Sequence, residues 1–186
     1  MTKIHRALFA MNRRLLPSEP ATSYLMHSDR SDIVDVLSNY ATGLDARDWT
    51  LWRSVFIDEV LFDLSSWTQQ EPRRLNADRV VKAQARMFAE LSVTQHFITN
   101  HRVTIDGDRA RCLAHMRAEH WIEVDPSKAD SARYTMFGYY DDKLVRTEQG
   151  WKIAEMQLNV TQTEGDRWVM DEATRRAKAK RELEPR

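Results

Sequence analysis

The second half of this chain contains four long segments in which residues alternate with the two-residue period of a β-strand. They occupy residues 94–105, 110–124, 134–146 and 151–163. The connections between them are short, and Asp106-Gly107 is a strong hairpin signal. Four successive strands joined in this way predict an antiparallel meander. Strands of this length must bend, so we expect β-bulges within them.

The first half of the chain carries helical periodicity instead. Apolar residues at helical spacing predict a helix that starts at the capping residues 28–31 and weakens at Gly43. Asp48 is expected to cap a short second helix, and Asn76 can cap a third. Residues 60–64 alternate enough for a further strand.

Helices followed by a run of strands are typical of an α+β domain, in which the helices cover one face of a strongly bent antiparallel sheet. A charged helix is expected after Gly165-Asp166, running to about Glu182. We therefore predict a flexible N-terminal arm, one folded domain and a C-terminal helical tail. These parts span residues 1–27, 28–165 and 166–186.

Composition argues against several classes of function. Lys+Arg and Asp+Glu number 28 each, and this zero net charge disfavours nucleic-acid or anionic-membrane binding. The single cysteine, Cys112, excludes an intramolecular disulfide framework and a cysteine-based zinc site. No apolar run approaches the roughly 20 residues of a membrane span, and residues 1–16 lack the apolar core of a secretory signal. A cytoplasmic location is therefore expected.

Cofactor, metal and nucleophile chemistry find little support in the sequence. The chain has 5 glycines and no glycine-rich phosphate loop, which argues against nucleotide binding. Four histidines between residues 96 and 120 match no helical metal-binding spacing, and alternation sends His115 and His120 to opposite faces. There is no nucleophile elbow, and Cys112 sits in mid-strand. Neither a metal nor a cofactor is expected.

Alternation along residues 110–124 separates a small apolar face from a charged one. The apolar face includes Cys112, Ala114, Met116 and His120, and we expect it to border the interior. His120 is the only ionisable residue on it. A histidine on an apolar face is more often a hydrogen-bonded core residue than a catalyst, so both interpretations of His120 stay open.

The strand at residues 94–105 carries two histidines on opposite faces. His96 shares its face with Asn100, whereas His101 shares the other with Val103 and Ile105. Val103 and Ile105 favour the second face as the inner one. His96 can also point inward only if a bulge intervenes, so alternation alone does not choose between the two histidines.

Asp45 lies just past the end of the first helical pattern, where a carboxylate opposes the helix dipole. It is either solvated there, closing the turn to Asp48, or it points into a pocket and holds an imidazole. A carboxylate that accepts a hydrogen bond from one ring nitrogen fixes the tautomer and raises the basicity of the other nitrogen.

Several short segments, taken together, resemble a known superfamily. They are YATGLDARDW at residues 40–49, TQHFI at 94–98, RAEH at 117–120, and GYYDDKLVR with GWKIA between 138 and 154. In this order they are similar to SnoaL-like proteins of the nuclear-transport-factor-2-like cone fold, and to scytalone dehydratase-like proteins most of all. The resemblance covers roughly residues 29–163.

The resemblance implies a cone-shaped sheet, with His96 as a catalytic base, Asp45 as its partner and His120 as a second catalytic histidine. Leu44 departs from the pattern, because the dehydratase has a tyrosine there that positions a water on the substrate carbonyl. Tyr40 or a strand tyrosine would have to take that role.

We therefore expect a cofactor-free acid–base enzyme acting on a hydrophobic cyclic or polyketide-like carbonyl compound, as a dehydratase, isomerase or cyclase. Its alternative is a non-catalytic ligand-binding module or the structural small subunit of a ring-hydroxylating dioxygenase. A homo-oligomer, dimer or trimer, is also expected. The candidate substrate-binding residues are Tyr40, Trp49, Phe56, Asn100, Met116 and Tyr140.

Overall fold

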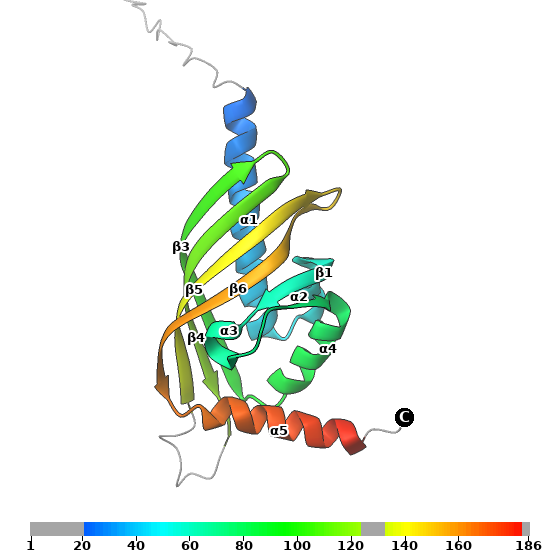
Figure 1. Ribbon diagram of the computed structural model, residues 1–186, viewed down its shortest axis with the longest axis vertical. Helices are drawn as coiled ribbons and strands as arrows, with labels where there is room; N and C mark the ends of the chain where they lie inside the picture. The colour runs from blue at the N-terminus through cyan, green and yellow to red at the C-terminus, as the bar shows by residue number, and fades with distance from the viewer. Residues whose placement is uncertain (1–20, 124–132, 184–186) are drawn as a thin grey trace, which may run out of the picture.

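The computed structural model describes residues 21–123 and 133–183, with side chains from residue 28 onward. It confirms an α+β domain built on one curved, unclosed sheet of six strands (Figure 1). The helices are α1 (Ala21–Ala46), α2 (Trp49–Ser54), α3 (Ser65–Thr68), α4 (Ala77–Phe88) and α5 (Trp168–Leu183). The strands are β1 (Phe56–Asp63), β2 (Arg73–Asn76), β3 (Val93–Asp106), β4 (Arg109–Trp121), β5 (Arg133–Thr147) and β6 (Gly150–Gly165).

The sheet has the order β2-β1-β6-β5-β4-β3. Strands β3 to β6 form the predicted antiparallel meander. Strand β1 pairs with β6 in parallel, so the sheet is mixed rather than wholly antiparallel. Two short elements, strand β2 and helix α3, were not predicted. Strand β2 pairs antiparallel with β1 and forms an edge of the sheet.

The helices enclose one end of the bent sheet. Helix α1 runs along its inner side and packs against β3 and β6, while α5 crosses the far end of the strands (Figure 1). Helix α4 packs against α2 and α5. Within the described ranges, no helix is both long and apolar enough to cross a membrane.

Helix α1 begins at Ala21 rather than at the capping residues 28–31. The polar side chains expected to cap it instead make tertiary contacts from within the helix. Asp29 accepts hydrogen bonds from Arg146 and from Trp151 Nε1, and Arg30 donates to the backbone carbonyl of His101. Of the arm predicted at residues 1–27, residues 21–27 belong to α1, and residues 1–20 lie outside the described residues.

A β-bulge in β3 answers the question that alternation left open. The pairing of β3 with β4 shifts register between Thr99 and Arg102, and Asn100 has a left-handed backbone with φ of 56°. His96 is inward before the bulge, and His101 is inward after it. The extra residue therefore turns both histidines to the same side of the sheet.

Gly43 allows α1 and α2 to approach each other closely. A Cβ atom at this position would lie 2.8 Å from both the Cβ and the backbone nitrogen of Trp52. Trp52 is 2% exposed and is surrounded by other rings, so it has little room to move. The glycine therefore serves close packing between the helices.

We predict that Gly43→Ala lowers the free energy of unfolding by about 1–3 kcal/mol, because the added methyl group overpacks this contact. Urea unfolding would measure the change. Thr42→Ala on the exposed side of the same turn is the matched control and should shift stability by less than about 0.5 kcal/mol. Equal stability of the two variants would contradict the close-packing role.

Candidate active site

Asp45 and His96 are brought together where the last turn of α1 meets the start of β3. The Asp45 Oδ1 atom lies 2.6 Å from His96 Nδ1, and Oδ2 accepts a hydrogen bond of 2.7 Å from the His96 backbone nitrogen. The His96 side chain is 5% exposed and that of Asp45 is 17% exposed. Both carboxylate oxygens thus hold the same residue, one its ring and the other its backbone.

Arg47 fastens this junction. Its backbone is left-handed, with φ of 59°, and ends the helix. The guanidinium donates to the Leu44 carbonyl at 2.7 Å and to Thr94 Oγ1 at 2.6 Å, so it joins the end of α1 to the start of β3. It also lies over the ring of Phe88 in α4, 5.3 Å from its centroid. Three elements are therefore fixed around Asp45.

The charge on Asp45 is stabilised by His96. Burial alone would raise the pKa of Asp45, but hydrogen bonds from the ring and backbone of His96 outweigh it and lower the pKa from its ordinary value. A carboxylate beside Nδ1 favours the tautomer in which Nδ1 carries the proton. The lone pair of Nε2 is then left for another partner.

His120 lies beside His96 on the inner face of β4. The two rings are perpendicular, with centroids 5.5 Å apart, and His120 is 1% exposed. Burial and the neighbouring charge of His96 lower the pKa of His120 to about 3, so its ring is neutral near neutral pH. A hydrogen bond to the backbone of Tyr134 favours a ring N–H, while Nδ1 has no protein partner. Nδ1 is therefore the ring nitrogen left to meet a ligand.

The two histidines line one cavity of about 70 Å³. Such a volume accommodates a compact group and lies well below the range of drug-sized pockets, which is about 300–1,000 Å³. Its wall is largely apolar and includes four flexible methionines, which adapt readily to a ligand. The lining residues are Tyr40, Leu44, Trp52, Phe62, Leu64, Trp67, Gln84, Met87, Phe88, His96, His120, Met136, Tyr140, Met156, Leu158 and Met170.

Tyr40 and Tyr140 supply hydroxyl groups to this cavity from α1 and β5. Their ring centroids are 5.4 Å apart, and their side chains are hydrogen-bonded to each other. Burial raises the pKa of both phenols above the ordinary value, so they remain protonated donors. This pair lines the same cavity as Leu44.

Four of the six expected substrate-binding residues lie away from the cavity wall. Phe56 and Met116 are buried in the core, and Trp49 packs against Trp52 and Phe88. Asn100 is exposed on the outer side of β3, and its amide lies 3.4 Å from His115 Nδ1. The bulge turns Asn100 outward, so the prediction of an inward amide is wrong.

Other lining residues, such as Trp67 and Met170, had no signal in the sequence pattern. Trp67 comes from the short helix α3, and Met170 comes from α5. Arg167 at the start of α5 lies over the Trp67 ring and donates to the Trp67 carbonyl at 3.1 Å. This contact, together with the packing of α3 on β6 and of α5 on α4, brings the two elements to the cavity.

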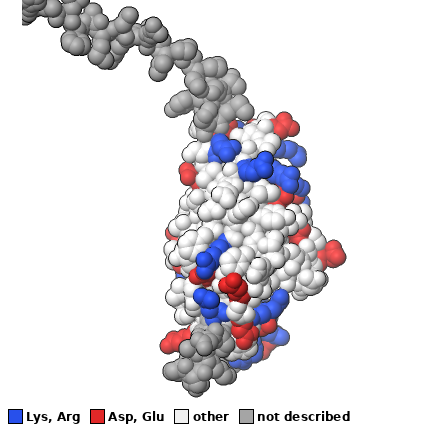
Figure 2. Space-filling view, turned by 90° about the vertical axis from the view of Figure 1, so that its left-hand side faces the viewer, with Lys and Arg blue, Asp and Glu red and all other residues white. Residues whose placement is uncertain are grey.

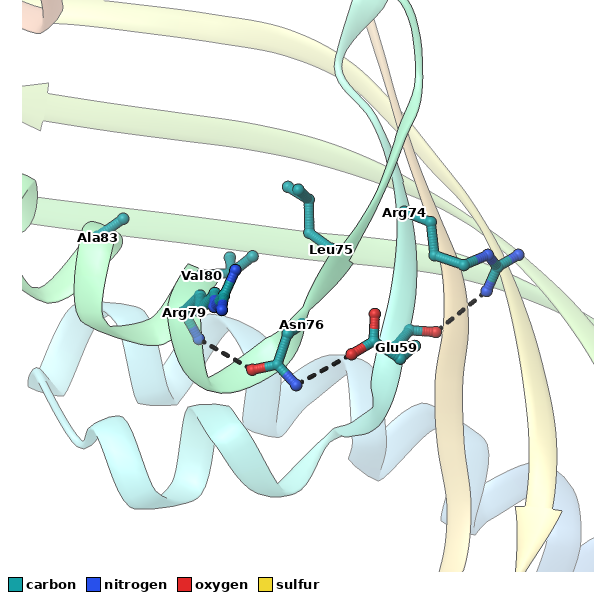
Figure 3. Close-up of a pocket in the computed structure, with 7 residues that line it drawn as sticks. All are labelled: Glu59, Arg74, Leu75, Asn76, Arg79, Val80 and Ala83. Carbon is teal, nitrogen blue, oxygen red and sulfur yellow. Dashed lines mark hydrogen bonds between the residues drawn. The ribbon is translucent and has the colours of Figure 1, made fainter.

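A second hollow lies between β2 and α4 and has a different character (Figure 3). It is an open groove of about 620 Å³ whose polar groups largely bind one another. Asn76 donates to Glu59 at 3.0 Å and accepts from the Arg79 backbone nitrogen, which caps α4 as predicted (Figure 3). In the described part of the chain, no group of three or more His, Cys, Asp or Glu residues could hold a metal ion.

Comparison with known proteins places the chain in a family. The model of the SnoaL-like domain matches residues 26–157. The chain belongs to the SnoaL-like domain family. Solved structures that share its fold include one named as a scytalone dehydratase and one named as a dehydratase of the NTF2-like family, 16% and 15% identical to this chain. No curated protein matches the sequence significantly.

Three solved structures illustrate the likeness of this SnoaL-like chain to known folds. The Kfla4162 protein of Kribbella flavida is 32% identical, with a TM-score of 0.71 over 81% of this chain and 99% of that one. A protein of Novosphingobium aromaticivorans named as an aromatic ring hydroxylase is 27% identical, with a TM-score of 0.67 over 79% and 97%. Another from that organism, named as a scytalone dehydratase, is 16% identical, with a TM-score of 0.63 over 78% and 91%.

The buried neutral state of His120 predicts a loss of stability in acid. The unfolded chain takes up a proton at His120 near pH 6.5, whereas the folded chain does so only near pH 3. The stability that comes from keeping His120 neutral is therefore fully present above about pH 6.5 and is lost as the pH falls from 6.5 towards 3. Between pH 7 and pH 5 the expected loss is about 2 kcal/mol.

Urea unfolding at both pH values would measure this loss. His120→Leu should remove about 2 kcal/mol of the difference between the two pH values, whatever its own stability. His115→Gln, which removes an exposed imidazole from the same strand, is the control and should keep the difference. An unchanged pH difference in His120→Leu would show that His120 is not held neutral.

Proposed function

We propose that this protein is a cofactor-free acid–base enzyme that eliminates water from a compact cyclic β-hydroxy carbonyl compound. The observation that carries the proposal is the contact between Asp45 and His96 at the wall of a largely apolar cavity. It leaves one unprotonated imidazole nitrogen as a base. Acid–base placement of this kind contributes roughly 10²–10⁴-fold to a rate.

The reaction follows from the groups present. His96 Nε2 removes the proton on the carbon next to the carbonyl, and Asp45 stabilises the imidazolium that forms. Because Tyr40 and Tyr140 are hydrogen-bonded to each other, one hydroxyl proton of the pair is left to donate to the carbonyl oxygen and stabilise the negative charge that develops there. As the electrons form a C=C bond, the C–O bond breaks and His96 returns its proton to the departing hydroxide. Water and the unsaturated carbonyl compound are the products.

In the proposed mechanism His120 is not the acid. The resemblance implied a second catalytic histidine at this position. A neutral ring with an unprotonated Nδ1 accepts a hydrogen bond and does not donate a proton from that atom. We therefore assign the acid step to His96. Isomerisation and cyclisation begin with the same proton abstraction and remain variants of the proposal.

We predict that His96→Ala lowers turnover of β-hydroxycyclohexanone by about 10²–10⁴-fold, because the base is removed. Formation of cyclohexenone, followed by ultraviolet absorbance, measures the rate. Circular dichroism would verify that the variant is folded. A folded His96→Ala variant with the wild-type rate would rule out the proposed base.

Asp45→Asn tests the orienting carboxylate. The amide cannot hold the imidazolium charge, so we expect kcat to fall by at least about tenfold with a smaller change in KM. Asp48→Asn, three residues further along, is the matched control and should keep both constants, because asparagine also caps a helix. If the two variants behave alike, Asp45 is not the partner of the base.

A second candidate is a non-catalytic subunit of a ring-hydroxylating enzyme. The 27% identity to the protein named as an aromatic ring hydroxylase favours it. A scaffold does not require a buried ionisable pair beside a cavity. The Asp45–His96 contact is such a pair and therefore favours the catalytic candidate. Stable association with an oxygenase subunit, combined with wild-type behaviour of His96→Ala, would support this second candidate.

A homo-oligomer and a cytoplasmic location stay predictions. The side of the molecule in Figure 2 is largely uncharged, with basic and acidic side chains in small separate groups. The outward side chains Val93 and Phe97 of β3 are 53% and 49% exposed. Apolar exposure of this kind is compatible with a second subunit.

A further inference from the structure

Three buried polar atoms around the candidate active-site cavity have no protein partner. They are Trp52 Nε1, Trp67 Nε1 and His120 Nδ1, and all three residues line the same cavity. The described residues contain two further such atoms, on His101 and Thr135, neither of which lines it. Buried polar atoms are almost always hydrogen-bonded, so a cluster of three requires an explanation.

The three atoms come from separate elements. Trp52 lies in α2, Trp67 in α3 and His120 in β4, so no single local irregularity accounts for them. Trp52 and His120 are 2% and 1% exposed, which leaves solvent outside the protein no access to either side chain. Their common feature is the cavity, and a ligand bound there is the partner that would satisfy all three.

The three atoms differ in whether they donate or accept a hydrogen bond. An indole Nε1 carries a hydrogen and only donates, so Trp52 and Trp67 require acceptor oxygens. We take His120 Nδ1 as an acceptor, because it has no protein partner while the ring is neutral and is hydrogen-bonded to the Tyr134 backbone. A hydroxyl group is the simplest partner for such an acceptor.

We propose that Trp52 and Trp67 are specificity residues that donate to an oxygen of the ligand, and that His120 accepts a hydrogen bond from a ligand hydroxyl. The ligand is then a compact ring that carries a hydroxyl group and an acceptor oxygen beyond the reacting carbonyl. A purely hydrocarbon or halogenated ring lacks these groups and leaves the three atoms unsatisfied.

This inference rests on the proposed function for the identity of the reacting carbonyl. The Tyr40–Tyr140 pair is assigned to that oxygen, so the indoles are free to recognise a second one. The rings of His96 and His120 are 5.5 Å apart. A hydroxyl held by His120 therefore lies next to the base, where a leaving hydroxyl must be.

Binding to the His96→Ala protein tests the inference without turnover. The probes are methylcyclohexane, cyclohexanone, the para cyclohexanedione and β-hydroxycyclohexanone, with affinities measured by calorimetry or by chemical-shift titration. We expect the dione and the hydroxyketone to bind more tightly than cyclohexanone by about 5–10-fold, the usual magnitude for one hydrogen bond. Equal affinities for all four probes, including no binding of any, would overturn the inference.

Isosteric replacement then assigns the donors. Benzothienylalanine keeps the shape of tryptophan but has sulfur in place of the indole N–H, so it avoids the cavity that Trp52→Phe creates in the core. Placed at position 52 or 67, it should abolish the preference for the dione over cyclohexanone. The same replacement of Trp49, which packs outside the cavity, is the control and should keep the preference.

His120→Leu should abolish the preference for the hydroxyketone and keep that for the dione. Loss of both preferences, or of neither, would contradict the assignment.

Failure of this inference can be distinguished from failure of the proposed function. If His96→Ala keeps full turnover while the indole replacement still removes oxygen selectivity, catalysis is wrongly assigned and ligand recognition stands. If selectivity is unchanged while His96→Ala loses turnover, the reverse holds.

Discussion

The structure depends on one polar junction between the end of a helix and the start of a strand. Asp45 holds both the ring and the backbone of His96, and Arg47 ties the preceding carbonyl to the same strand. An acidic residue at a helix C-terminus opposes the helix dipole. That local cost is offset because the carboxylate gains two hydrogen bonds from His96, and because a guanidinium takes over the Leu44 carbonyl at the helix end.

Much of the fold was available from the sequence because two different periods divide the chain. The meander, the caps at Asp48 and Asn76, and the inward placement of His120 follow from local rules that the tertiary structure does not override. A bulge in β3 was expected, but its position could not be predicted, because an asparagine within a strand pattern does not by itself indicate a left-handed backbone. The side of the sheet predicted for Asn100 was therefore wrong.

The candidate site was predictable only in part. The positions of Asp45 and His96 rested on family resemblance, because alternation treated His96 and His101 alike. Trp67 and Met170 were missed because the tertiary packing of α3 and α5, which brings them to the cavity, leaves no local pattern in the sequence. Phe56 and Met116 were plausible wall residues, but both are buried in the core and neither lines the cavity. Apolar periodicity identifies burial without distinguishing a core contact from a ligand contact.

The bulge at Asn100 also divides β3 into two stretches with separate tasks. The stretch before it carries His96 and is fixed by Asp45 and Arg47, whereas the stretch after it leads to the hairpin and is held by Arg30 from α1. The one inserted residue reverses which face of the sheet each later side chain of β3 occupies. The hairpin end can therefore change its sequence, length or inward side chains without altering the orientation of His96. Variation among such proteins can accumulate at one end of a strand whose other end stays constant.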